Sequence, residues 1–205
     1  MLDADLSRHL SQRLAQPLLG RAAHQAYSHP QSYGRHFGPA PMYARKAAIM
    51  VLIYWNGTEW ILPLTRRVAK GIHASQICFA GGGIDPGETA VEAALRECGE
   101  ETGWAPTKAN VVGQLSPIFV YASNNFVSCI VAITREQPVW KRDPREVAEV
   151  IDVPLEHICS DPKIHQTQLD LFGQNSTAPC FRWNSYDIWG ATSMVISELK
   201  SVILS

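Results

Sequence analysis

The chain has 205 residues, 46% of them hydrophobic and 18% charged, so it can bury a core and does not have the composition of a disordered protein. Its 18 Lys and Arg residues against 19 Asp and Glu residues give a net charge of −1, which lacks the basic excess of a general nucleic-acid binder. No apolar run approaches the roughly 18 residues of a membrane span, so we expect neither a nucleic-acid partner nor a membrane partner.

The N-terminal 44 residues are predicted to form a helix followed by an extended connection. Leu6, Leu10 and Leu14 recur every four residues, which favours a helix over residues 3–24. This helix packs on its own domain or, alternatively, contacts a second copy in a homodimer. Residues 28–44 contain three prolines and two glycines, which is typical of an extended segment. We therefore separate residues 1–44 from a main domain over residues 45–205.

The first residues and the cysteines favour a cytoplasmic protein. Asp3 and Asp5 stand where a secretory signal would carry positive charge, and no apolar stretch follows them. The five cysteines are an odd number without a C-x-x-C pair, which argues against a disulfide framework and a zinc knuckle. Buried thiols in a reducing compartment are the simplest interpretation.

Residues 45–205 alternate between strand-like and helix-like segments. Residues 47–55 form an apolar run, Asn56-Gly57 is a hairpin turn signal, and residues 59–64 can return as the partner strand. Further strands are predicted at residues 111–115, 126–134, 146–153, 181–183 and 187–189. Helices are predicted at residues 88–102 and 191–204, the second with Val195, Leu199 and Val202 on one stripe. This alternation predicts an α/β fold with a mixed sheet and helices on both faces.

The helix predicted at residues 88–102 places three carboxylates on one face. At about 100° per residue, Glu97, Glu100 and Glu101 lie within a single turn, and Arg96 can reach Glu100 at i+4. Gly103 is suited to end the helix. The core-facing side is predicted to be formed by Val91, Ala94, Leu95 and Cys98.

Two interpretations of this acidic face compete. A run of charges often forms a solvated surface. Against that, like charges at i, i+3 and i, i+4 repel, and the preceding residues 81–83 and 85–87 form a glycine-rich loop that brings backbone carbonyls close. Clustered carboxylates with a backbone carbonyl are the hard oxygen ligands that Mg²⁺ or Mn²⁺ prefers.

The same segment resembles the signature of the Nudix hydrolases, Gly-x5-Glu-x7-Arg-Glu-U-x-Glu-Glu-x-Gly-U, in which U is a bulky apolar residue. The matching residues are Gly82, Glu88, Arg96, Glu97, Cys98, Glu100, Glu101, Gly103 and Trp104. Every fixed position matches, with Cys98 a mild variant at a U position. With average residue frequencies, a chance match is of order 10⁻⁸ per window.

The resemblance implies a Nudix-type α/β/α sandwich with a mixed central sheet, and hydrolysis of a nucleoside diphosphate linked to another group, X. It implies that Glu97, Glu100 and Glu101 hold Mg²⁺ or Mn²⁺ with a main-chain carbonyl near Gly82. Arg96 would orient the glutamates and pair with Glu88. The family often takes its general base from outside the signature; Glu146 is the first candidate and Glu149 the second, and either could instead be an exposed strand residue.

The flanking residues resemble the coenzyme A diphosphatase group of this family. Its motif runs roughly L-L-T-x-R-S, then an Arg, then H-x-G-Q-x-x-F-P-G-G, and residues 62–82 here follow it. The matches are Arg66 or Arg67, His73, Gln76, Phe79, Gly81 and Gly82. Ala80 and Ser75 replace a Pro and a Gly of the motif, and Lys70 is the nearest substitute for its second Arg. Residues 123–126 and 189–199 also look like this group.

This second resemblance implies that Arg66, Arg67, Lys70 and His73 bind the substrate, facing the glutamates across a cleft. The alternatives are an ordinary basic loop and a His that only caps it; Trp189 is either core packing or an adenine platform. Three functions are therefore considered. The first is hydrolysis of coenzyme A or an acyl-CoA to adenosine bisphosphate and a phosphopantetheine. The second is the same chemistry on an ADP-sugar, a dinucleotide or a nucleoside triphosphate, and the third is nucleotide sensing without turnover.

Overall fold

The computed structural model describes residues 6–29, 40–69, 74–104, 110–171 and 174–205. Its centre is a seven-stranded mixed sheet in the order β3-β2-β1-β6-β5, with β4 paired to β1 and β7 to β2. The strands are β1 (Arg45–Trp55), β2 (Trp60–Arg67), β3 (Ile77–Cys78), β4 (Gly81–Gly83), β5 (Asn110–Val120), β6 (Asn125–Thr134) and β7 (Val147–Pro154). Strands β1 and β6 are parallel and the other pairs are antiparallel.

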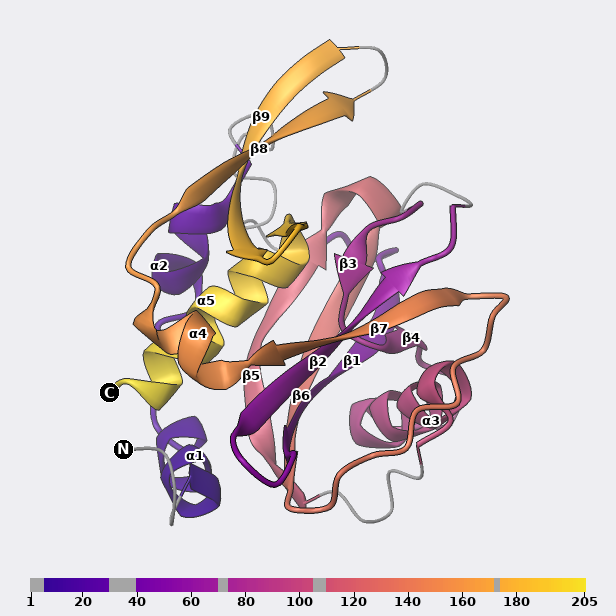
Figure 1. Ribbon diagram of the computed structural model, residues 1–205. Coiled ribbons are helices and arrows are strands. Elements are labelled where there is room, and N and C mark those ends of the chain that lie inside the picture. Colours follow the sequence, from indigo (N-terminus) through magenta and orange to yellow (C-terminus); the bar gives the residue numbers. More distant parts are fainter. Residues whose placement is uncertain (1–5, 30–39, 70–73, 105–109, 172–173) are drawn as a thin grey trace.

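Helices cover both faces of this sheet, as Figure 1 shows. Helix α3 (Ala90–Thr102) lies on one face, and α5 (Ala191–Ile203) lies on the other with the short helices of the N-terminal part. The remaining helices are α1 (Leu6–Leu14), α2 (Arg21–His24), α4 (Leu155–Ser160), η1 (Gln25–Tyr27) and η5 (Tyr121–Ser123). The expected mixed sheet between helices is confirmed.

Successive side chains of β1 point to opposite faces of the sheet and contribute to two hydrophobic clusters, one on each face. Val51 and Ile53 belong to the larger cluster with α5, whereas Met50 and Leu52 belong to the cluster under α3. The predicted stripe of α5 is buried throughout. On α3 the prediction for Val91 is wrong, because its side chain is 36% exposed and Ala93 is buried in its place. Two adjacent alanines, Ala93 and Ala94, face the sheet there.

The hairpin and the C-terminal helix of the prediction are confirmed, with ends shifted by a few residues. Strands β1 and β2 pair Tyr54 with Ile61 and Trp55 with Trp60. The Asn56 side chain accepts hydrogen bonds from the backbone N–H groups of Thr58 and Glu59, which fixes the turn.

The single helix predicted for residues 3–24 is wrong within the described part. It is divided into α1 and α2, because Pro17 has no N–H for a helix interior and Gly20 adopts a positive φ of 51°. Leu6 and Leu10 are buried in the larger core, and His9 Nε2 lies 3.1 Å from the Val202 carbonyl oxygen of α5. Helix α1 thus packs on its own chain; the division at residue 44 and a homodimer stay predictions.

A buried carboxylate fastens this N-terminal part to the rest. Glu198 of α5 is fully buried and accepts hydrogen bonds from the backbone N–H groups of Gly20 (2.8 Å) and Ser116 (3.0 Å). The Ser116 hydroxyl donates a third at 2.7 Å, and His24 Nε2 lies 3.2 Å from the other oxygen. Mainly the His24 and Ser116 side chains hold the pKa of Glu198 below its usual range, against the burial that acts to raise it.

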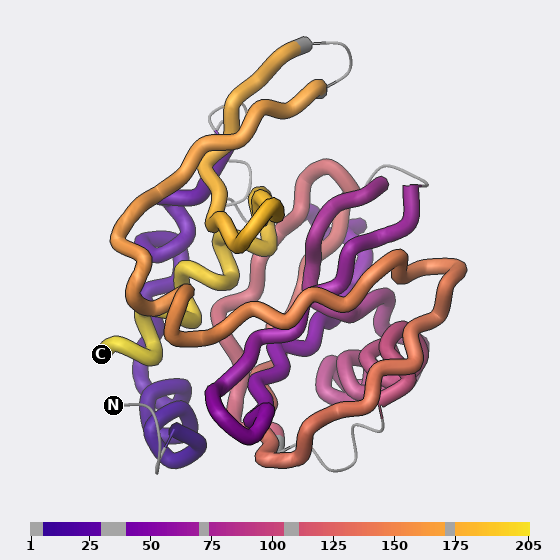
Figure 2. The backbone as a smooth tube through the Cα atoms, in the orientation of Figure 1, coloured from indigo at the N-terminus to yellow at the C-terminus, as the bar shows by residue number. Residues whose placement is uncertain are grey.

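A second sheet of three strands extends beyond the central one, as Figures 1 and 2 show. It comprises β8 (His165–Leu171), β9 (Gln174–Trp183) and β10 (Tyr186–Trp189) in the order β10-β9-β8. The predicted segments 181–183 and 187–189 are the paired ends of β9 and β10, whereas β8 and α4 were not predicted. Trp189 ends β10 and is partly buried.

Candidate active site

The signature helix begins and ends with specific local contacts. Thr89 caps α3 through a capping box, in which its side chain accepts from the Glu92 backbone N–H and the Glu92 carboxylate accepts from the Thr89 N–H. At the other end Gly103 adopts a left-handed φ of 69°. A Cβ at Gly103 would also lie 2.4 Å from the carbonyl oxygen of Lys141. The glycine of the signature is therefore required by both its conformation and its neighbour.

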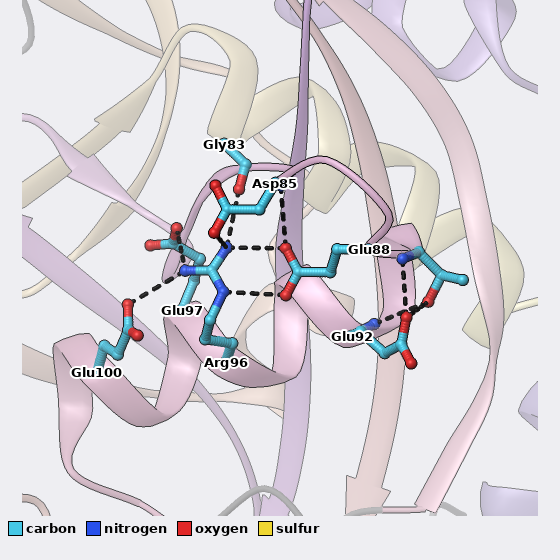
Figure 3. Close-up of polar contacts among 8 residues, drawn as sticks. Gly83, Asp85, Glu88, Glu92, Arg96, Glu97 and Glu100 are labelled. Atoms are coloured by element: carbon cyan, nitrogen blue, oxygen red, sulfur yellow. Dashed lines mark hydrogen bonds and ion pairs between the residues drawn. The ribbon is translucent and has the colours of Figure 1, made fainter.

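Arg96 lies at the centre of the acidic residues (Figure 3). It makes a bidentate pair with Glu88, with its Nε 2.9 Å from Oε1 and its Nη2 3.0 Å from Oε2. Its Nη1 donates to Glu97 at 2.8 Å and to Glu100 at 3.2 Å, and Nη2 also donates to the Gly83 carbonyl at 3.0 Å. One guanidinium thus joins the loop before the helix to two of the three predicted metal ligands, which agrees with an orienting role.

Gly82 of β4 lies directly against Glu97. A Cβ at residue 82 would come within 2.4 Å of the Glu97 Cδ and within 2.5 Å of both carboxylate oxygens. Only a residue without a side chain lets this carboxylate lie against the backbone of β4. Position 82 is therefore glycine for space, and the backbone there can contribute an oxygen beside a glutamate.

Glu101 differs from its two neighbours because it is buried, with 3% of its surface exposed. Its Oε2 atom has no hydrogen-bond partner, and its Oε1 lies 3.7 Å from Nη1 of Arg67. Burial raises the pKa of Glu101 to about 7; Arg67 acts to lower it, while the carboxylates of Glu146 and Glu97 raise it further. A buried carboxylate oxygen without a partner suits a bound cation.

Glu146 reaches this site through a loop and not through a strand. It lies one residue before β7, with an exposed side chain, and its carbonyl oxygen accepts a hydrogen bond from the Val68 N–H at 3.0 Å. The start of the strand predicted at residues 146–153 is therefore one residue early. The position nevertheless brings Glu146 beside Arg67 and into electrostatic contact with Glu101.

The two adjacent arginines of β2 point in different directions. Arg67 faces Glu101, whereas the Nε and Nη2 atoms of Arg66 both lie 3.0 Å from Oε2 of Glu149. The Tyr186 hydroxyl of β10 donates to the other Glu149 oxygen at 2.7 Å and, as the largest cause, lowers the pKa of Glu149. Glu149 is thus engaged away from the glutamate helix, which disfavours it as the general base.

The basic residues predicted to bind the substrate therefore do not all lie together. Arg67 lies beside Glu101, whereas Arg66 pairs with Glu149, and a role of either in substrate binding stays a prediction. Lys70 and His73 lie outside the described residues. Tyr186 contacts Glu149 although no sequence motif marks it, and the docking of residues 141–146 on the end of α3 has no sequence signal either.

The carboxylates do not converge on one point. Within residues 6–29, 40–69, 74–104, 110–171 and 174–205, no three His, Cys, Asp or Glu side chains are arranged to hold a metal ion. Glu97 and Glu100 each place one oxygen on Arg96 instead. By donor type the glutamates nevertheless fit a hard divalent cation, because such an ion prefers carboxylate oxygens and Glu101 Oε2 has no hydrogen-bond partner.

Comparison with known proteins identifies the family. Residues 44–172, more than half of the chain, match the NUDIX domain. The chain belongs to the Nudix family. A protein of Photorhabdus laumondii described as an uncharacterized Nudix hydrolase, NudL, is 30% identical over 160 residues, covering 78% of this chain and 85% of its own. The NudL of an Escherichia coli O6:H1 strain is 28% identical over 156 residues, covering 76% and 81%.

The chain also shows similarity to solved structures. The Caenorhabditis elegans Ap4A hydrolase is 20% identical with a TM-score of 0.47, covering 54% of this chain and 80% of that one. The NUDIX domain of Shewanella oneidensis NrtR, solved with ADP ribose, is 19% identical with a TM-score of 0.47, covering 65% and 88%. The chain is a Nudix pyrophosphohydrolase, in a family that acts on small nucleotides and generally uses divalent metal ions. No helix in the described residues is long and apolar enough to cross a membrane.

Proposed function

We propose that this Nudix hydrolase cleaves the pyrophosphate of coenzyme A or an acyl-CoA, giving adenosine bisphosphate and a phosphopantetheine. The observation that carries the hydrolytic site is Glu101, a buried carboxylate with an unpartnered oxygen, placed on the signature helix opposite Arg67. Support for the choice of coenzyme A comes from the motif at residues 62–82, of which Arg67 faces the glutamates.

In this proposal Glu97, Glu100, Glu101 and the carbonyl of Gly82 hold Mg²⁺ or Mn²⁺. Bound there, the metal would neutralise phosphate charge and make the attacking water more acidic. Arg96 keeps the carboxylates of Glu97 and Glu100 in place through its hydrogen bonds to both. Because burial raises the pKa of Glu101, the chain itself must lose a proton near neutral pH before this carboxylate can act as a ligand.

Glu146 is proposed as the general base. It takes a proton from the water that attacks one phosphorus of the pyrophosphate, and the bond from that phosphorus to the bridging oxygen breaks. Arg67 lies beside Glu101 and offers positive charge to the phosphates on the open side of the helix. Arg66, Lys70 and His73 are proposed to contact the rest of the substrate.

A substrate panel tests this proposal. Purified protein is incubated with Mg²⁺ or Mn²⁺ and coenzyme A, acetyl-CoA, an ADP-sugar, a dinucleotide or a nucleoside triphosphate, and products are identified by mass spectrometry. We expect adenosine bisphosphate and a phosphopantetheine, and loss of both products in E101Q. Faster turnover of another substrate would refute the coenzyme A assignment alone. Nucleotide binding without turnover of any substrate would favour a sensing module.

A further inference from the structure

The segment that precedes β7 is fastened to the end of the signature helix. The backbone N–H of Lys141 donates to the Thr102 carbonyl at 2.8 Å, and the N–H of Asp143 donates to the Glu101 carbonyl at 2.9 Å. These carbonyls belong to the last turn of α3, which has no partners within the helix. The segment also packs against Gly103, where a side chain would collide with it. The main chain of Glu101 and the main chain of Asp143 are therefore held together.

Asp143 also makes the turn that ends at Glu146. Its carbonyl oxygen accepts hydrogen bonds from the N–H groups of Glu146 (3.2 Å) and Val147 (2.8 Å). Its carboxylate accepts from the Arg145 backbone N–H at 2.9 Å and from the Arg145 guanidinium, with Nε at 3.0 Å and Nη2 at 2.6 Å. The side chain of Asp143 thus closes the turn locally, as Asp does in Asx turns.

The far side of Glu146 is fixed as well. Its carbonyl accepts the Val68 N–H, so that the residue is tied to the strand end that carries Arg67. The backbone of Asp143 is therefore hydrogen-bonded to both Glu101 and Glu146. Its side chain is 18% exposed and the Arg145 side chain is 86% exposed, so this ion pair lies at the surface of the protein.

We infer that Asp143 is a positioning residue, which sets where the Glu146 carboxylate stands relative to Glu101 without touching the substrate itself. The inference rests on the proposed function, in which Glu146 accepts the proton of the attacking water. Without the Asp143 carboxylate the turn loses four hydrogen bonds from Arg145, and Glu146 is left on a looser loop. A general base must lie within hydrogen-bond reach of its proton, so a loosened Glu146 slows the chemical step more than substrate binding.

A double-mutant cycle tests the inference on the full-length protein with the substrate that the panel identifies. We expect D143A to lower kcat by about tenfold or more while KM changes less than about twofold. In an E146Q background the same D143A change should have no further effect on kcat, because a residue that acts through Glu146 has nothing left to position. D143N should fall between wild type and D143A, because the amide oxygen can still accept the Arg145 N–H.

The matched control is D187A. Arg182 Nε lies 2.6 Å from Asp187 Oδ1 and its Nη2 3.2 Å from Oδ2, so this variant removes an Arg–Asp pair of similar geometry between β9 and β10. Its kcat should equal that of wild type. If D143A does not fold by circular dichroism, D143N takes its place in the cycle, with the same expected dependence on Glu146.

Three results would overturn the inference while leaving the hydrolytic function intact. They are unchanged kcat in D143A or its replacement, additive losses in the double variant, and unchanged kcat in E146Q. Absence of turnover by the wild-type protein on every substrate of the panel would instead refute the proposed function, and the inference with it.

Discussion

Replacing Glu101 by Gln should stabilise the metal-free protein above neutral pH while abolishing hydrolysis. The pKa of a glutamate is ordinarily 4.5, and burial raises the pKa of Glu101 to about 7. A difference of this size corresponds to about 3 kcal/mol of unfavourable ionisation in the folded protein. The Gln amide must find a partner of its own in place of the carboxylate, so we expect a net gain of about 1–3 kcal/mol.

Because the pKa of Glu101 is raised in the folded protein, the stability difference between wild type and E101Q depends on pH. Between pH 4.5 and about 7 the folded protein holds a proton on Glu101 that the unfolded chain has lost, so the free energy of unfolding falls as pH rises. The free-energy cost of ionising buried Glu101 is absent below pH 4.5 and reaches its full size above about pH 7. E101Q lacks this titration. The two stability curves should therefore meet at low pH and separate through the interval up to neutrality.

Urea denaturation in the presence of a chelator, at several pH values from 4.5 to 8, measures this difference. The matched control is E100Q, because Glu100 lies on the same face of the helix but its side chain is 62% exposed. We expect E100Q to change the free energy of unfolding by less than about 0.5 kcal/mol at every pH. If E101Q proves less stable than wild type at pH 8, or if their difference does not vary with pH, the interpretation of Glu101 as a strained buried carboxylate is wrong.

Three further predictions follow from contacts elsewhere in the structure. G82A places a Cβ within 2.4 Å of the Glu97 carboxyl carbon, so steady-state assays should show at least a tenfold loss of kcat, with about 1–3 kcal/mol lost in urea denaturation; wild-type kcat would contradict the packing argument. E198Q leaves one of two buried backbone donors without a carboxylate oxygen and should lower the free energy of unfolding by about 2–4 kcal/mol, with kcat at 20 °C unchanged; a loss below about 1 kcal/mol would show that the network is not needed. S75G should stabilise the protein by about 0.5–1 kcal/mol, because Ser75 adopts a φ of 58° that favours glycine; a lower thermal midpoint would count against strain there.

The signature helix was predictable because its residues report on local structure. Spacing alone placed Arg96 near Glu100, the resemblance implied its pair with Glu88, and the structure adds the hydrogen bond to Glu97. Helical spacing places Glu100 and Glu101 on the same face and does not distinguish them. In the structure Glu100 is exposed and Glu101 is buried. That difference comes from β4 and the loop after β6, which pack on one side of the helix and not on the other.

Other parts of the structure could not be predicted from the sequence, for identifiable physical reasons. Alternation along a strand means that Arg66 and Arg67 face opposite sides, but the sequence does not say which one faces the glutamates. Leucine periodicity continues across Pro17, but a proline in a helix interior lacks the N–H that the helix needs, so the periodic segment divides there. Strand β8 is polar and pairs only with β9, so neither apolar periodicity nor a turn motif indicates it.

The buried carboxylate of Glu198 has a practical consequence for anyone trimming the protein. A fragment that starts at residue 45 would retain every residue of the Nudix signature, yet it would discard two of the groups that compensate this charge, Gly20 and His24. An acid left inside an apolar interior without its donors must pick up a proton or draw water inward, and both outcomes loosen the last helix. Catalytic completeness and folding autonomy thus have different boundaries along this chain.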